Sequence, residues 1–170
     1  MQNQINMSKR LDIIDDVFTW DRSTYFFNKL IHYPFVYGER DSVRFAPTGM
    51  VHDLNANDII YQEILEKTIT CLPELKNLTP YRSYINFFIP GEFPNFHEDG
   101  QGLTILHYIT ELYNPYEGGE TQFVNEDQTI TGILPKPGRM TIFDGMITHR
   151  ATSCKTLPRL TLAIKYAKSD

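Results

Sequence analysis

The chain has 170 residues, of which 41% are hydrophobic, so we expect one domain spanning residues 1–170. A chain of this length buries roughly 70% of its unfolded surface, enough for a core without disulfide or metal staples. Its 16 Lys and Arg against 21 Asp and Glu give a net charge of -5. That sign disfavours nucleic acid as the main partner, because such a protein must neutralise a row of phosphates.

The cysteines and the N-terminal sequence indicate the cellular compartment in which the protein is expected. Cys71 and Cys154 lie far apart without paired spacing, so neither a disulfide framework nor a zinc knuckle is indicated. The start, MQNQINMSKR, is polar with no apolar run behind it, and no stretch approaches the roughly 18 apolar residues of a membrane span. We therefore expect a soluble, cytoplasmic protein with no signal peptide and no membrane partner.

The first 80 residues carry mainly helical signals. After a candidate strand at 11–18, Asp21 is expected to cap a helix, RSTYFFNKLIH, that stops at Pro34. A clearer helix, IIYQEILEKTITCL, follows Asn57 or Asp58 and ends at Pro73. We expect these helices, at about 1–80, to support a core formed by the rest of the chain.

From Tyr81 onward the sequence predicts strands. Short runs rich in β-branched and aromatic residues are separated by Pro-Gly, Asp-Gly, Gly-Gly and Asn-containing turns at regular spacing. The runs are YRSYINFFI, LTILHYIT, ETQFV, TITGIL, RMTIF and RLTLAIKY. This spacing is typical of an antiparallel sandwich or barrel, so the predicted fold class is mainly β (α+β), with the β core at about 81–167.

The segment FHEDG carries the first chemical signal. His97 and Asp99 are two residues apart, so in an extended chain both side chains project from one face. His149, in GMITHRATS, is the best supplier of a third ligand. Two histidines and one carboxylate form the facial triad of non-heme Fe(II) oxygenases, which leaves positions for a bidentate co-substrate and dioxygen. On its own a short H-x-D motif is more often a surface ion pair, so this prediction depends on the residues that accompany it.

The strand RLTLAIKY supplies that support. Arg159, Thr161 and Lys165 share one face with Ala163, while the opposite face is apolar and must be core. Arg159 and Thr161 would then face a polar cavity, where a guanidinium fork can bind a carboxylate bidentately beside a hydroxyl. Lys165 itself, together with Lys168, is expected to be part of a solvated chain end.

Taken in order, H-x-D, GGET, and a histidine followed ten residues later by R-x-T resemble the 2-oxoglutarate and Fe(II)-dependent dioxygenases, with the prolyl 4-hydroxylase-like branch nearest. The resemblance covers about residues 81–167. It implies a double-stranded β-helix, also called a jelly roll or cupin-like fold. It further implies iron held by His97, Asp99 and His149, and 2-oxoglutarate held at its distal carboxylate by Arg159.

The resemblance also implies two softer assignments and one departure. Thr161 would assist Arg159, and Tyr108 matches a tyrosine that in prolyl hydroxylases hydrogen-bonds the same carboxylate. Where relatives often have a tyrosine, this chain has Phe88, which leaves open what contacts the C1 end of 2-oxoglutarate. Tyr84, Phe88, Phe93 and Phe96 flank the metal arm as candidate substrate contacts.

The expected activity is hydroxylation of an aliphatic C–H bond, with Fe(II), 2-oxoglutarate, O2 and, as a further candidate, ascorbate. The most favoured substrate is a prolyl or other residue of a peptide or protein. The alternatives are hydroxylation of a free amino acid or other small molecule, oxidative demethylation of nucleic acid, which the acidic balance opposes, and a non-catalytic metal-binding or carbohydrate-binding jelly roll.

Overall fold

The computed structural model describes residues 9–38, 45–111 and 113–167. Two α-helices and ten strands lie within these ranges. The elements are β1 (Leu11–Ile14), α1 (Trp20–Leu30), β2 (Val36–Tyr37), β3 (Met50–Asp53), α2 (Ile59–Cys71), β4 (Arg82–Phe88), β5 (Gly102–Ile109), β6 (Thr121–Val124), β7 (Ile130–Ile133), β8 (Met140–Asp144), β9 (His149–Ala151) and β10 (Arg159–Ala167), with short 3-10 turns at Pro73–Leu75 and Pro115–Glu117.

Both helices begin at a residue whose side chain caps them. Of the two predicted caps of α2, Asn57 and Asp58, the structure has Asp58, whose carboxylate accepts a hydrogen bond from the Tyr61 N–H at 2.8 Å. The prediction of Asp21 for α1 is wrong. Thr19 is the cap, and its hydroxyl accepts from the Arg22 N–H, so Asp21 falls in the first turn, where a carboxylate still favours the helix dipole.

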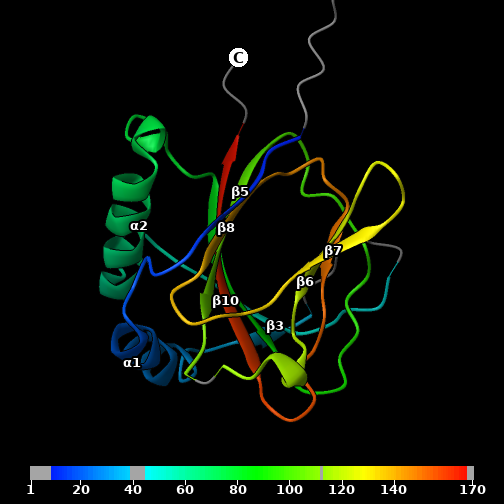
Figure 1. Ribbon diagram of the computed structural model, residues 1–170. Helices are drawn as coiled ribbons and strands as arrows, with labels where there is room; N and C mark the ends of the chain where they lie inside the picture. Colours follow the sequence, from blue (N-terminus) through cyan, green and yellow to red (C-terminus); the bar gives the residue numbers. More distant parts are fainter. Residues whose placement is uncertain (1–8, 39–44, 112, 168–170) are drawn as a thin grey trace, which may run out of the picture.

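Seven of the strands form one antiparallel sheet in the order β1-β8-β5-β10-β4-β3-β2 (Figure 1). The longest strand, β10, lies at its centre and pairs with β4 on one side and β5 on the other. The remaining strands form a smaller antiparallel sheet in the order β7-β6-β9. Among the described residues, neither helix is both long and apolar enough to cross a membrane.

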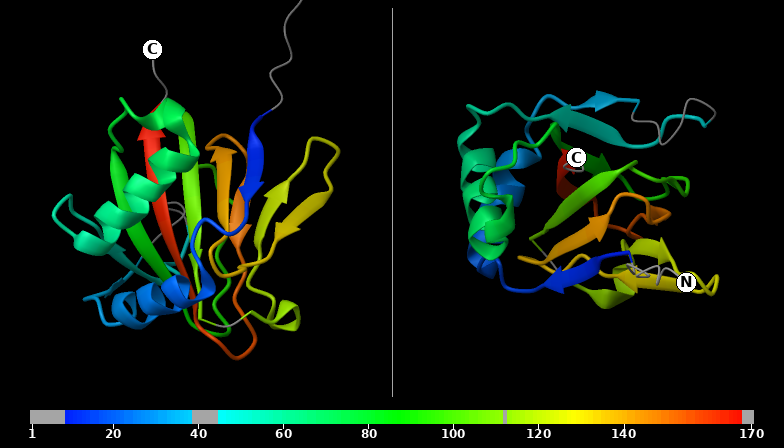
Figure 2. Two further views of the ribbon diagram at one scale, coloured as in Figure 1. Left: turned by 60° about the vertical axis from the view of Figure 1, so that its left-hand side comes forward. Right: turned by 90° about the horizontal axis from the view of Figure 1, so that it is seen from above.

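The large sheet is covered on both faces. The helices α1 and α2 lie against one face, and the small sheet lies on the other side (Figure 1 and Figure 2). One hydrophobic cluster joins the helices to the large sheet, and a second joins the two sheets through residues such as Phe123 and Phe143. The result is mainly β with two helices and antiparallel sheets.

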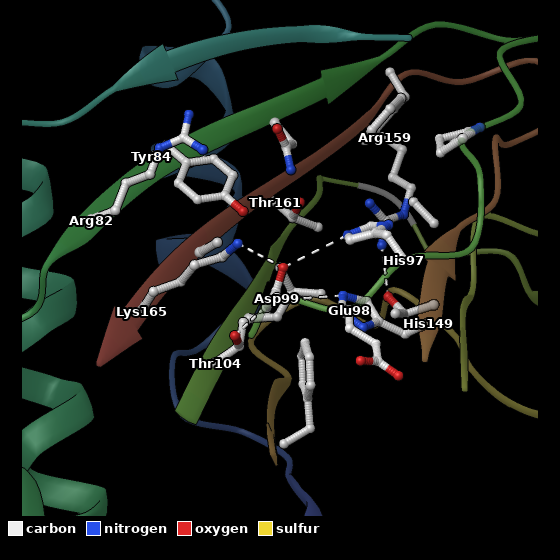
Figure 3. A pocket seen from close by; sticks show the side chains of 18 residues that line it. Arg82, Tyr84, His97, Glu98, Asp99, Thr104, His149, Arg159, Thr161 and Lys165 are labelled. Carbon is white, nitrogen blue, oxygen red and sulfur yellow. Dashed lines mark hydrogen bonds and ion pairs between the residues drawn. The ribbon is translucent and has the colours of Figure 1, made fainter. Parts of the chain in front are cut away.

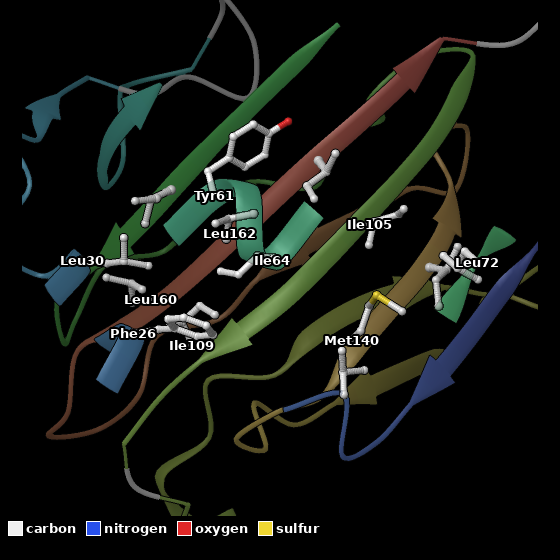
Figure 4. Packing of buried hydrophobic residues seen from close by; sticks show 14 of the residues in the cluster. Phe26, Leu30, Tyr61, Ile64, Leu72, Ile105, Ile109, Met140, Leu160 and Leu162 are labelled. Carbon is white, nitrogen blue, oxygen red and sulfur yellow. The ribbon is translucent and has the colours of Figure 1, made fainter. Parts of the chain in front are cut away.

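The alternation predicted for β10 is confirmed. Leu160, Leu162, Ile164 and Tyr166 are buried in the cluster beneath the helices. Figure 4 shows Leu160 and Leu162 among these packed side chains. Their neighbours on the strand therefore face the space between the two sheets. The strand is buried on both faces, so its polar residues lie in the protein interior and require partners there.

The described part of the first 80 residues is less helical than predicted. The strand expected at 11–18 is present as the shorter β1, which pairs with β8 at one edge of the large sheet. The sequence did not predict β3, which pairs with β4, or β2, which pairs with β3 and forms the other edge. These two strands are four and two residues long and show little alternation. Their pairing comes from the edges that the longer strands offer, which local sequence does not encode.

Candidate metal centre and carboxylate pocket

The structure brings His97, Asp99 and His149 together. His97 lies in the loop between β4 and β5 and forms an isolated bridge with His149, the first residue of β9. Asp99 lies two residues further along the same loop, where its N–H donates to the Gly145 carbonyl at 2.8 Å. One ligand atom from each of the three side chains lies within 4.8 Å of the others, so together they could hold a metal ion.

The two histidines present the same nitrogen to the centre. Nδ1 of His149 is 2.8 Å from the Ile147 carbonyl, and Nδ1 of His97 is 3.1 Å from that of Asn95. A carbonyl can only accept, so Nδ1 carries the proton and Nε2 has a lone pair for a metal. Each Nε2 is 3.7 Å from an oxygen of Asp99. Burial lowers the pKa of His149 to about 4, which keeps its imidazole neutral at pH 7.

The carboxylate of Asp99 is buried and receives a donor on each oxygen. The Thr104 hydroxyl donates to Oδ2 at 2.7 Å, and the Lys165 ammonium donates to Oδ1 at 2.6 Å. Burial opposes ionisation of Asp99, but its contacts with His149, Lys165 and Thr104 outweigh that effect and hold its pKa below the usual value. Asp99 therefore offers a charged oxygen to a metal ion at neutral pH.

The expectation that Lys165 is part of a solvated end is wrong. Its residue is only 9% exposed, and its side chain points from β10 into the pocket beside Asp99 and Tyr84 (Figure 3). A solvated side chain was expected because Lys165 is close to the end of the chain. However, β10 remains paired with β4 up to Lys165 and with β5 beyond it. Lys168, for which the same solvated position was expected, lies outside the described residues.

Arg159 lies in the same pocket and is 3% exposed. Its Nε donates to the Gly119 carbonyl at 2.7 Å, and Nη2 donates to the Thr121 hydroxyl at 2.8 Å. These two contacts fix the guanidinium plane and leave further N–H groups for a ligand. A buried guanidinium among neutral partners is costly unless an anion joins it, so the arrangement favours an acidic ligand.

Two threonine hydroxyls complete this end of the pocket. Thr121 Oγ1 accepts from both Arg159 and the Tyr108 hydroxyl, which leaves its own proton to donate. Thr161 Oγ1 is buried with no hydrogen-bond partner, which calls for a polar ligand group. A guanidinium with two hydroxyl donors is what a carboxylate needs, so these residues fit one end of a dicarboxylate. Thr121 was missed by sequence reasoning, although its position in GGET offered a signal.

The other predicted residues divide between the pocket and its surroundings. Tyr108 is buried beside Arg159, 5.7 Å from the guanidinium carbon to the ring centre, but it does not line the pocket. Tyr84 and Phe88 line it, as does Asn86 between them, whereas Phe93 and Phe96 do not. Phe93 is 77% exposed.

The pocket lies between the two sheets and has a volume of about 200 Å³. It is smaller than the roughly 300–1,000 Å³ of pockets that enclose drug-sized ligands. It therefore suits a metal ion with a small dicarboxylate. Its wall combines the polar residues described above with the apolar Leu106, Phe143 and Ala163.

No protein-family model matches this chain, and no curated protein matches it in sequence. Solved structures do match it in fold. A prolyl-4-hydroxylase from Pseudomonas putida is 13% identical with a TM-score of 0.73, and the match covers 96% of this chain and 95% of that one. A prolyl hydroxylase from Trichoplax adhaerens, in complex with a hypoxia inducible factor peptide fragment, is 14% identical with a TM-score of 0.71 over 97% and 86% of the chains.

A third similar structure is HygX from Streptomyces hygroscopicus, with nickel, 2-oxoglutarate and hygromycin B bound. It is 13% identical with a TM-score of 0.72, and the match covers 95% of this chain and 84% of that one. The chain thus has the fold of the 2-oxoglutarate–Fe(II) oxygenases. Within that class, the prolyl hydroxylases are among the structures it resembles, which agrees with the resemblance found in the sequence.

Proposed function

We propose that this protein is a 2-oxoglutarate-dependent Fe(II) dioxygenase that hydroxylates an aliphatic C–H bond. The observation that carries the proposal is one pocket holding both the His97–Asp99–His149 cluster and the buried Arg159. The first set offers two imidazole nitrogens and one carboxylate, the ligands of a facial triad. The second offers a carboxylate anchor, for which a hydrolytic zinc site or a lectin has no need.

In this proposal His97, Asp99 and His149 are the metal ligands. Arg159 binds the distal carboxylate of 2-oxoglutarate, with Thr121 and Thr161 donating beside it. Tyr108 supports that end through its hydrogen bond to Thr121. The iron and 2-oxoglutarate, when bound, supply the oxidation of the C–H bond by O2, with succinate and carbon dioxide as co-products.

The chain's own contribution is orientation and exclusion of water. Arg159 is fixed by two hydrogen bonds, so the co-substrate meets a preorganised anchor rather than a mobile side chain. Leu106 and Phe143 give the pocket an apolar wall, which limits water around the reacting groups. We also propose that the chain forms a single domain whose core is a double-stranded β-helix.

For the acceptor, we favour a prolyl or other residue of a peptide or protein. The pocket is small, so an acceptor has to reach the metal from the mouth, as a side chain presented by a polypeptide does. A prolyl hydroxylase with a bound peptide is among the similar structures. Hydroxylation of a small molecule is the second candidate, because HygX, of the same fold, is seen with hygromycin B.

Turnover tests the proposal. The purified protein with Fe(II), 2-oxoglutarate, ascorbate and O2 is expected to form succinate slowly without an acceptor and faster with one. Proline-containing peptides and free amino acids serve as the two acceptor panels. The Asp99→Ala variant is expected to form none. Equal succinate in the wild type and in Asp99→Ala would overturn the proposed function.

A further inference from the structure

The two donors to Asp99 are themselves neighbours in the large sheet. Thr104 on β5 and Lys165 on β10 lie opposite each other in register, and both face the pocket. Thr104 takes one carboxylate oxygen and Lys165 takes the other. The metal-binding loop is therefore attached to the centre of the sheet through one cross-strand pair.

The loop that carries Asp99 needs to be anchored to the sheet because Asp99 itself lies outside every strand. Among the described residues its main chain makes one hydrogen bond, to the Gly145 carbonyl, and the carboxylate could still rotate about the side-chain bonds. Two donors on different oxygens remove that freedom and fix the carboxylate plane.

Lys165 is well suited to fixing the Asp99 carboxylate because its own side chain is held in place. Its strand pairs on both sides, with Arg82 opposite on β4 and Thr104 opposite on β5. Its ammonium lies 5.2 Å from the centre of the Tyr84 ring, and the side chain is largely buried. A lysine with this little freedom acts as a fixed donor rather than a mobile surface charge.

We propose that Lys165 is a positioning residue of the metal centre, which holds the Asp99 carboxylate in the orientation that faces the two histidines. The inference rests on the proposed function. A cation this close also repels a divalent metal, so the two effects oppose each other. We expect positioning to dominate, so that loss of Lys165 weakens metal binding by roughly 10- to 100-fold, as loss of a hydrogen-bond partner of a metal ligand does elsewhere.

The test is the affinity of the full chain for Mn(II) alone, measured calorimetrically without oxygen or co-substrate. Lys165→Met is expected to bind Mn(II) roughly 10- to 100-fold more weakly than the wild type, and Lys165→Arg to recover most of the loss. Arg139→Met is the control. It removes a cation that pairs with Asp15 at 2.7 Å and does not line the pocket, and it is expected to keep its affinity.

A double-mutant cycle separates positioning from a general structural role. In the Asp99→Ala background, Lys165→Met is expected to cause no further loss of Mn(II) affinity, because there is no carboxylate left to orient. An equal loss in both backgrounds, or tighter binding by Lys165→Met, would overturn the inference while leaving the proposed function intact. A wild-type protein that binds no divalent metal would instead overturn the proposed function itself.

Discussion

The backbones of His97 and His149 form an antiparallel bridge, in which each N–H donates to the other's carbonyl oxygen at 2.9 Å. Their imidazole rings consequently lie 4.5 Å apart between centroids. Two histidines from distant parts of the sequence are thus brought together by main-chain hydrogen bonds. The bridge does not depend on either side chain, so the ligands can be removed one at a time without breaking it.

The first prediction concerns these ligands. His97→Ala, Asp99→Ala and His149→Ala are each expected to lower Mn(II) or Fe(II) affinity by more than about 100-fold, which exceeds the cost of losing a hydrogen-bond partner of a ligand. Glu117→Gln is the control, because Glu117 accepts hydrogen bonds from Thr156 and does not line the pocket. Near-normal affinity in any of the alanine variants would remove that residue from the metal site.

The second prediction concerns Arg159. Arg159→Lys keeps the charge but loses the two fixed hydrogen bonds to Gly119 and Thr121. We expect 2-oxoglutarate to bind the metal-loaded variant roughly 10- to 100-fold more weakly, since hydrogen bonds to charged groups are worth about 1.5–3 kcal/mol. Metal affinity should be unchanged.

Arg150→Lys provides the matched control for that measurement. Arg150 is on β9, where its guanidinium contacts Gln122 and the ring of Phe96 and does not line the pocket. Its substitution is expected to leave 2-oxoglutarate affinity unaltered. If the Arg159 and Arg150 variants bound 2-oxoglutarate equally well, the distal anchor would have to be sought elsewhere.

The third prediction concerns Gly145. A Cβ at this position would overlap the carbonyl oxygen of Gly100 and press on Asp99, so Gly145→Ala should displace the metal-binding loop. We expect metal affinity to fall by roughly tenfold, because the ligand geometry is disturbed. Gly91→Ala is the control: its φ of +89° makes alanine strained, but nothing lies within 4 Å of the added atom. An equal effect of both substitutions would show general destabilisation instead.

The fourth prediction concerns acid stability. His107 is buried beneath the helices, its Nε2 is 2.8 Å from the Thr68 hydroxyl, and burial lowers its pKa to about 3. In the unfolded chain His107 binds a proton as the pH falls below about 6.5, whereas in the folded chain it stays neutral down to about pH 3. Protonation therefore favours the unfolded chain, so the free energy of unfolding is highest above about pH 6.5 and falls as the pH is lowered towards 3. At pH 4.5 the loss is about 3 kcal/mol.

Urea unfolding at pH 7 and pH 4.5 measures this effect. His107→Gln is expected to be less stable at pH 7 but to lose about 3 kcal/mol less than the wild type on acidification. His32→Gln is the control, because His32 is exposed. An unchanged pH dependence in His107→Gln would assign the acid sensitivity to other groups, such as His149.

Much of the site could be predicted from the spacing of residues along single segments of the sequence. The H-x-D alternation brought His97 and Asp99 to one centre, and the period of two on β10 separated its core face from its pocket face. Both patterns act through the geometry of a single extended segment, which sequence encodes directly. The predicted roles of these residues remain predictions that the variants above test.

What could not be predicted depends on pairing between distant segments. The closeness of Lys165 to the end of the chain predicts a solvated side chain, and no neighbouring residue in the sequence indicates otherwise. Its partner Asp99 comes from a distant part of the chain. Thr121 reaches Arg159 only because the small sheet lies opposite the large one. The short strand β3 likewise forms by pairing with the open edge of β4, and β2 forms by pairing in turn with β3.

Anaerobic titration of 2-oxoglutarate into the Fe(II)-loaded protein, monitored by visible absorption, tests directly whether one pocket binds both the metal and the co-substrate. We expect a weak metal-to-ligand charge-transfer band that saturates with one equivalent and is weakened in Arg159→Lys at subsaturating co-substrate. If iron binds tightly without any such band, the pocket holds a metal but not 2-oxoglutarate, and the proposed function is wrong.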